Sequence, residues 1–152
     1  MIEVADSASF DRPAAAVFAA LTDFAAYPAW QEAVESSVLV DGPLRVGARV
    51  RTIRREMGWR GQVETTVAEF VPGELLTLAT AAGTSPGVRQ SYRLTSDGGG
   101  CRLGYQLALD GVPRLLEPAV RAQLRRQVRR MLLRLAEHTA AAVQPSGGVA
   151  GR

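Results

Sequence analysis

The chain has 152 residues, of which 47% are apolar and 22% are charged, and its formal net charge is +3. This length fits one domain with a sizeable core, and the composition is too apolar for a disordered protein. The single cysteine, Cys101, excludes a disulfide framework, and the single histidine, His138, argues against histidine-rich metal centres and most Ser–His catalysis, so we expect no metal and no cofactor.

A strand and two helices are predicted at the start of the chain. Residues 2–10 place their larger apolar side chains at every second position, which is typical of a strand with one buried face. A helix follows over 13–24, because Pro13 fits a first helical turn and the apolar residues after it have helical spacing. A break separates it from a second short helix over 28–33, which carries Trp30.

Six strand-like runs and one long helix follow. Glycine or proline marks most of the breaks between the runs, as expected of short turns. The long helix is predicted over 113–143, so that residues 1–143 form one domain and residues 144–152 form a disordered tail. This order of elements predicts an α+β fold in which a seven-stranded, curved antiparallel sheet wraps around the C-terminal helix. The six runs are 34–40, 46–57, 60–71, 75–81, 87–95 and 101–110.

The second and third of these runs form a hairpin whose register decides which side chains point inward. A two-residue turn at 58–59 pairs Thr52 with Thr65 on the more apolar face, which is therefore the inner one. This face also carries one charge, Arg54. We expect its guanidinium to reach water or to pair with Glu56, because an unpaired buried charge is costly. The alternative is that it holds a ligand carboxylate or enolate through a forked hydrogen bond.

The last two runs place Gln90, Tyr92 and Tyr105 on an otherwise apolar inner face, while Arg89 and Arg93 point the other way. Such groups suit a ligand cavity that needs a few polar contacts. They suit an ordinary core equally well, because a buried tyrosine usually finds a hydrogen-bond partner in the protein. The pattern leaves both interpretations open.

The long helix combines an apolar stripe, flanked by Gln123 and Gln127, with an arginine-rich face. Residues 114–137 carry seven arginines and two glutamates, a net charge of +5. A solvated face in a protein without lysine is the simplest explanation, and binding to an anionic membrane is the alternative. Nucleic acid is not an expected partner, because no aromatic residue lies among these arginines. The stripe consists of Leu116, Val120, Leu124, Val128, Met131 and Leu135.

Several other chemistries have no signal in the sequence. No glycine-rich phosphate-binding loop precedes a helix, and no pair of carboxylates shares an inner face. The chain does not open with a basic segment followed by an apolar one, and no apolar run is long enough to span a membrane. A cytoplasmic location is therefore expected.

Five segments together resemble the START-like (SRPBCC) superfamily, in its polyketide cyclase/dehydrase and lipid-transport branch. Their order and spacing carry the resemblance, which extends over about residues 2–142. At its motif positions we interpret Trp30 as a core residue at the edge of a cavity and Asp23 as the cap of the second helix. The segments are 11–18 (DRPAAAVF), 21–30 (LTDFAAYPAW), 46–49 (VGAR), 67–75 (VAEFVPGEL) and 100–103 (GCRL).

The resemblance implies a helix-grip fold with a deep apolar cavity between the sheet and the C-terminal helix. Members bind lipids, sterols or polyketides, and some cyclise or aromatise polyketides, so the fold alone does not select the function. The residues that we expect around the cavity are Phe24, Trp30, Thr52, Arg54, Thr65, Gln90, Tyr92, Tyr105, Leu107, Leu116, Val120, Gln123 and Leu124.

Three functions are compatible with this interpretation. The leading hypothesis is a non-catalytic protein, a monomer or homodimer, that binds a hydrophobic small molecule, with transport of that molecule as an extension of binding. The second is a polyketide aromatase/cyclase, with Arg54, Tyr92 and Tyr105 as its catalytic candidates. The third is a regulatory protein that associates weakly with an anionic membrane, or with a partner, through the arginine-rich helix face.

Overall fold

Seven strands in the described part of the chain form one antiparallel sheet in the order β1-β7-β6-β5-β4-β3-β2. The computed structural model describes residues 1–40, 42–56 and 58–150, and the side chains of residues 1–140 within these ranges. The strands are β1 (Ile2–Phe10), β2 (Val34–Leu39), β3 (Arg49–Glu56), β4 (Trp59–Val71), β5 (Leu75–Ala79), β6 (Gly87–Asp97) and β7 (Gly100–Asp110). The helices are α1 (Ala14–Thr22), η1 (Phe24–Ala29), η2 (Arg114–Leu116) and α2 (Glu117–Ala150).

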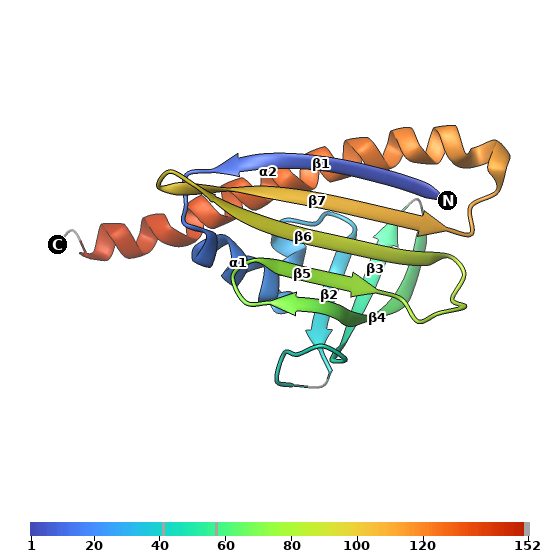
Figure 1. The fold of residues 1–152 in the computed structure, drawn as a ribbon, viewed down its shortest axis with the longest axis horizontal. Helices are drawn as coiled ribbons and strands as arrows, with labels where there is room; N and C mark the ends of the chain where they lie inside the picture. The colour runs from blue at the N-terminus through green and yellow to red at the C-terminus, as the bar shows by residue number, and fades with distance from the viewer. Residues whose placement is uncertain (41, 57, 151–152) are drawn as a thin grey trace.

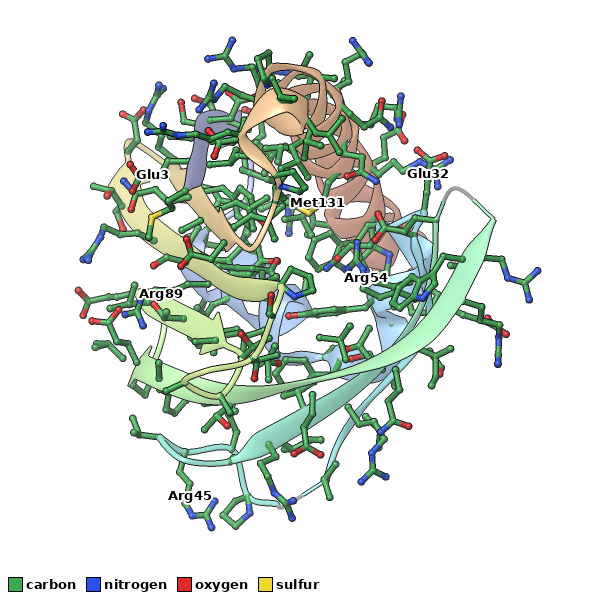
Figure 2. The ribbon with its side chains drawn as sticks, turned by 90° about the vertical axis from the view of Figure 1, so that its right-hand side faces the viewer. Glu3, Glu32, Arg45, Arg54, Arg89 and Met131 are labelled. Carbon is green, nitrogen blue, oxygen red and sulfur yellow. The ribbon has the colours of Figure 1, made fainter. Side chains whose placement is uncertain are left out.

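The sheet curves around α2, as the sequence predicts (Figure 1). From β2 to β7, strands that are consecutive in the chain are neighbours in the sheet, and β1 completes the sheet by pairing with β7. The segment of α1 and η1 therefore carries the chain from one edge of the sheet to the other. In the end view, Arg54 of β3 and Met131 of α2 lie in the interior, whereas Glu3, Arg45 and Arg89 lie outside (Figure 2).

The β3–β4 hairpin has a different register from the predicted one. Glu56 pairs with Trp59, whereas a turn at 58–59 would pair it with Gly61, and Thr52 pairs with Val63 instead of Thr65. The prediction is off by two positions on the opposite strand. Because side chains alternate with a period of two, this shift leaves every side chain on its predicted face.

The β6–β7 pair has the predicted register. Tyr92 lies opposite Tyr105, and Gln90 lies opposite Leu107. Both tyrosines are buried, whereas the side chain of Arg93 is exposed on the outer face. The inner face predicted from these two strands is therefore confirmed.

The second helix lies earlier than predicted. It is a 3₁₀ segment over Phe24–Ala29, not a helix over 28–33, and Trp30 follows it as the C-cap residue. Asp23 occupies the N-cap position, but its side chain makes no capping hydrogen bond, so the predicted capping role is wrong. The short-range hydrogen bond from the Trp30 N–H to the Tyr27 carbonyl closes the segment and turns the indole into the core.

The long helix begins at Glu117, after a 3₁₀ turn that contains Leu116, and its backbone continues to Ala150. Its buried apolar side chains, among those described, are Val128, Leu132 and Leu135. The predicted stripe missed Leu132, and it wrongly included Leu116, which is 53% exposed. The disordered tail over 144–152 stays a prediction, and its last two residues lie outside the described part of the chain. Among the described residues, no helix is both long enough and apolar enough to cross a bilayer.

A series of aromatic rings connects η1 to the sheet. The ring of Tyr27 lies 5.2 Å from that of Phe24 and 4.8 Å from that of Trp30, centroid to centroid. Trp30 then contacts Tyr92 edge-on at 6.4 Å, and Tyr92 lies 5.0 Å from Tyr105. Each such ring contact adds to the stability of the fold, in addition to what the burial of the apolar ring surface contributes. The series therefore holds η1 firmly against the inner face of β6 and β7.

Two neighbouring glycines of the β6–β7 hairpin offer a matched test of how closely β1 approaches β7. A Cβ atom at Gly100 would lie 2.1 Å from the carbonyl oxygen of Phe10, at the end of β1, whereas a Cβ atom at its neighbour Gly99 would meet nothing within 4 Å. We expect Gly100→Ala to lower the free energy of unfolding by about 2 kcal/mol, because backbone atoms must shift. Gly99→Ala should change it by less than about 0.5 kcal/mol. Chemical denaturation of both variants measures the difference, and equal stabilities would contradict the close approach of β1 and β7.

Candidate functional site

A cavity of about 580 Å³ lies between the inner face of the sheet and α2. Its volume falls within the range of small-molecule sites in proteins. Apolar side chains from six strands and the helix form much of its wall, among them Val50, Leu78, Val88, Leu107, Leu124 and Met131. The cavity is therefore an apolar space with a few polar groups.

Eight of the thirteen side chains that the sequence places around a cavity lie on its wall. They come from three regions, namely the residue after η1, the inner faces of the strands, and the middle of α2. The sheet contributes most of them, because the alternation of side chains in a strand reveals its inner face. The eight are Trp30, Thr52, Arg54, Thr65, Gln90, Tyr105, Leu107 and Leu124.

Three of the expected side chains lie elsewhere for clear reasons. Phe24 is buried on the far side of Tyr27 and does not reach the cavity. Tyr92 is fully buried in the layer of aromatic rings and is not part of the wall. Leu116 belongs to the 3₁₀ turn before α2 and is largely exposed.

The other two, Val120 and Gln123, lie on the helix itself. They precede Leu124 and Gln127 by one turn on the same helix face, and the wall on α2 starts only at Leu124. The first turns of α2 lie near the start of β1 instead, where the Met1 amino group lies 3.6 Å from Glu117. Helical spacing identifies the face of a helix, but it does not show how far along the helix a cavity extends.

Several wall residues were missed by the sequence analysis. Some lie in irregular segments, namely residues 31–33 after η1 and 84–86 between β5 and β6, and Leu78 lies in β5, whose apolar residues occur on both faces. Others, such as Val50 and Val128, lie in regular elements whose inner face the sequence identifies. Irregular segments carry no periodic signal. Only the Tyr-Pro-x-Trp pattern at residues 27–30 pointed to this region, because Tyr27 and Trp30 both line the cavity.

The Gln90 side chain accepts two hydrogen bonds from tyrosines. The Tyr105 hydroxyl donates to Gln90 Oε1 at 2.9 Å, and the Tyr92 hydroxyl donates to the same atom at 3.5 Å. Burial raises the pKa of both phenols well above the ordinary value, although the nearby Arg54 charge acts in the opposite direction. Both tyrosines are therefore neutral hydrogen-bond donors in the folded protein.

Arg54 forms the ion pair that the sequence predicts. Its Nε lies 3.1 Å from Glu56 Oε2, and the amide of Gln127 on α2 donates to Glu56 Oε1 at 2.9 Å. Burial alone would raise the pKa of Glu56, but the hydrogen bond and charge of Arg54 and the Gln127 contact outweigh it and lower the pKa. Glu56 is thus a carboxylate at neutral pH that neutralises Arg54 and links β3 to the helix.

Much of the positive charge in the middle of α2 is neutralised by ion pairs. Arg129 lies 2.6 Å from Asp6 of β1, and both Arg130 and Arg134 contact Glu32, at 3.1 and 3.8 Å. These pairs hold the helix to β1 and to the segment after η1. They also reduce the charge that this face could offer to an anionic surface. Within the described ranges, no group of three or more residues could hold a metal ion.

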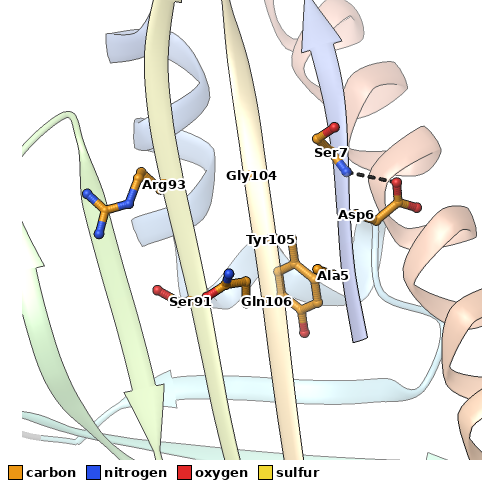
Figure 3. Close-up of a pocket in the computed structure, with 8 residues that line it drawn as sticks. All are labelled: Ala5, Asp6, Ser7, Ser91, Arg93, Gly104, Tyr105 and Gln106. Carbon is orange, nitrogen blue, oxygen red and sulfur yellow. Dashed lines mark hydrogen bonds between the residues drawn. The ribbon is translucent and has the colours of Figure 1, made fainter. Parts of the chain in front are cut away.

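A second hollow, of about 510 Å³, lies on the outer face of the sheet across β1, β7 and β6 (Figure 3). It forms where Gly104 has no side chain, and Ser7, Ser91 and Gln106 surround it. Its floor is backbone, and neither a helix nor another strand layer covers it. We therefore take the internal cavity as the candidate site, because only that space can remove an apolar ligand from water on both sides.

Comparisons with known proteins agree with this geometry. The family model for polyketide cyclase / dehydrase and lipid transport matches residues 1–140. No curated protein matches the sequence closely enough to count as a relative.

Solved structures share the fold at low sequence identity. The protein TTHA0849 from Thermus thermophilus has a TM-score of 0.79 at 19% identity, and a START superfamily protein from Mycobacterium smegmatis has 0.79 at 14%; each alignment covers 92% of this chain and 98% of the other. The di-domain ARO/CYC BexL from the BE-7585A biosynthetic pathway has a TM-score of 0.74 at 16% identity, with 95% of this chain and 48% of that chain covered.

These identities establish the fold alone, a helix-grip fold of the START-like type. The match of the family model over residues 1–140 also establishes the family. The chain belongs to the polyketide cyclase / dehydrase and lipid transport family.

Proposed function

We propose that the protein binds a hydrophobic small molecule in the cavity between the sheet and α2. The observation that supports this most is the cavity itself, whose wall combines apolar side chains with only a few polar groups. An apolar ligand that enters it leaves water, which is worth about 25 cal/mol for each Å² of surface that is buried. The described cavity wall also offers no cluster of metal ligands, so binding rests on shape, apolar contact and hydrogen bonds.

We infer that the cavity opens between the β3–β4 hairpin and α2, because exposed wall residues lie there. Trp59 at the start of β4 lines the cavity and is 52% exposed, and the exposed Arg130 lines it from the helix. The indole of Trp59 covers Gly61, where a Cβ atom would lie 2.2 Å from the ring. A glycine at this position therefore lets the ring lie flat beside the entrance.

Filling the cavity should abolish binding. Leu107 lies on the wall and is not fully buried, so Leu107→Trp should place a large ring in the space. We expect this variant to bind dodecanoic acid at least about tenfold more weakly than the wild type in native mass spectrometry. The control, Val38→Trp, adds the same ring on β2 where the side chain is 52% exposed, and should bind as the wild type does.

The same experiment includes an organic extract of the purified wild-type protein, which identifies any ligand retained from the host. If the delipidated wild type binds neither dodecanoic acid nor the extracted compounds at micromolar concentration, the proposal fails. Equal binding by Leu107→Trp and wild type would place the ligand outside the cavity.

Catalysis on a polyketide is the second candidate function, favoured by Arg54 and Tyr105 on the same wall and by the fold shared with BexL. The guanidinium N–H groups not used by Glu56 suit an enolate oxygen, and the neutral Tyr105 phenol can donate a hydrogen bond to a carbonyl. Tyr92, the third candidate from the sequence, is not on the wall.

A poly-β-ketone tethered to an acyl carrier protein tests the catalytic function. If the protein is a cyclase, it changes the proportions of the cyclised products relative to the spontaneous reaction. Arg54→Ala should then return the proportions to the spontaneous ones, because no cation remains to hold the enolate. A wild type that leaves the proportions unchanged would exclude the cyclase and leave the binding function in place.

The contact of Glu56 with Arg54 and Gln127 predicts a pH dependence of stability. Because the folded protein lowers the pKa of Glu56, its carboxylate stabilises the fold above the ordinary pKa of 4.5 and loses this effect as the pH falls through the lower, folded value. The wild type should therefore be more stable than Glu56→Gln at pH 7, and the difference should vanish at acidic pH. Urea unfolding from pH 3 to pH 7 measures it, and a difference independent of pH would contradict the ion pair.

A further inference from the structure

The turn between β7 and α2 exposes two neighbouring leucines. In the 3₁₀ segment η2, Leu115 is 95% exposed and Leu116 is 53% exposed. The turn is ordered by a hydrogen bond, since the N–H of Leu116 donates to the carbonyl of Pro113 at 2.9 Å. Single exposed apolar side chains are common on protein surfaces, whereas a neighbouring pair leaves in water an apolar area that a partner would bury favourably.

The arginines around this turn have no acidic partner. Four of them lie in η2 and in the first turns of α2, within about 15 Å of the start of that helix. None of the four forms an ion pair with a described residue, and Arg126 donates only to the neutral Gln123. The arginines in the middle of α2 differ, because Asp6 and Glu32 neutralise them. The four are Arg114, Arg121, Arg125 and Arg126.

The local charge remains positive when the nearby acids are included. Residues 110–126 contain these four arginines and two acids, Asp110 and Glu117, which leaves a net charge of 4 − 2 = +2. The amino group of Met1 lies 3.6 Å from Glu117 and offsets that carboxylate. The exposed leucines therefore lie within a positively charged part of the surface.

We propose that η2 and the first turns of α2 dock on an anionic phospholipid bilayer. In the docked protein Leu115 and Leu116 enter the boundary between headgroups and acyl chains, and the four arginines stay among the lipid phosphates. The sequence pattern suggests the whole arginine-rich face of the helix for such a contact. The structure restricts it to the start of the helix and adds the leucines, and the inference holds whatever the cavity binds.

A bilayer fits this surface better than a nucleic acid or an acidic protein does. A nucleic acid offers phosphates but no apolar phase for the leucines, and residues 110–126 contain no aromatic side chain on which a base could stack. An acidic protein would need a groove shaped to receive Leu115, which protrudes from a tight turn. A fluid bilayer accepts such a side chain without a matching groove.

The docking surface adjoins the wall of the cavity. A Cβ atom at Gly111, in the segment that leads into η2, would lie 2.8 Å from Ser85 Oγ and 3.0 Å from Pro86 Cα. Ser85 and Pro86 both line the cavity. The segment from β7 to α2 turns at the same end of the molecule as the N-terminus (Figure 1). A protein docked through this turn therefore holds its cavity close to the bilayer.

Cosedimentation with lipid vesicles tests the proposal on the delipidated full chain. One set of vesicles is phosphatidylcholine alone, and the other contains about 30% phosphatidylglycerol. We expect the wild type to bind the anionic vesicles at least about tenfold more tightly, because each arginine near an anionic surface contributes a factor of about five. This binding should weaken as NaCl is raised from about 0.1 M to about 0.5 M, because salt screens the attraction.

Matched variants locate the contact. Leu115→Ser should bind the anionic vesicles about tenfold more weakly, because it removes an inserted side chain. Its control is Leu133→Ser, which makes the same change at a 56% exposed position further along α2 and should bind as the wild type does. Arg114→Gln should weaken binding about fivefold. Its control, Arg93→Gln, removes the same charge from the outer face of β6 and should have no such effect.

Three results would overturn the docking surface. The first is a wild type that binds neither kind of vesicle, or binds both equally. The second is wild-type binding by both Leu115→Ser and Arg114→Gln, which would place the contact elsewhere. The third is binding to a double-stranded oligonucleotide that only Arg114→Gln weakens, without binding to vesicles, which would identify a soluble polyanion as the partner.

Binding of dodecanoic acid separates this inference from the proposed function. Leu115 is not part of the cavity wall, so Leu115→Ser should bind the acid as the wild type does. Loss of vesicle binding with retained binding of the acid overturns the docking surface alone when the wild type shows it. Vesicle binding without binding of the acid overturns the cavity proposal and leaves the docking surface in place.

Discussion

One helix cannot fill the concave face of a seven-stranded sheet, and the cavity follows from this mismatch. Leu132 and Leu135 bury one side of α2 in the core, while the side that carries Leu124, Val128 and Met131 faces the cavity. Collapse of the helix into the gap is opposed by its polar contacts at the periphery, with Asp6, Glu32 and Glu56. These contacts thus attach α2 to the rim of the sheet and prevent the helix from moving into the cavity.

Polar side chains around the cavity form two hydrogen-bonded sets. In one set Tyr92 and Tyr105 donate to Gln90, and in the other Arg54 and Gln127 donate to Glu56. Both sets join side chains from different elements and so maintain the shape of the cavity.

Sequence periodicity was sufficient for the fold and for the sheet side of the site, and it failed where the backbone is irregular. The alternation in β6 and β7 identified Gln90 and Tyr105, and even the wrong hairpin turn kept Thr52 and Arg54 on the correct face, because the error was an even number of residues. Gln31 follows a 3₁₀ segment that has no periodic pattern. Its place on the cavity wall depends on how the segment after η1 packs against the sheet, and only the folded structure shows it.

The positions of the two tryptophans make the site visible to fluorescence spectroscopy. The sequence contains only Trp30 and Trp59, and both line the cavity, one fully buried and the other half exposed at the entrance. The buried indole should emit at short wavelength and be shielded from acrylamide, whereas the exposed one should emit at longer wavelength and be quenched readily. Selective excitation of tryptophan therefore reports on the interior and the entrance of one site, with no label attached and no background from any other part of the chain.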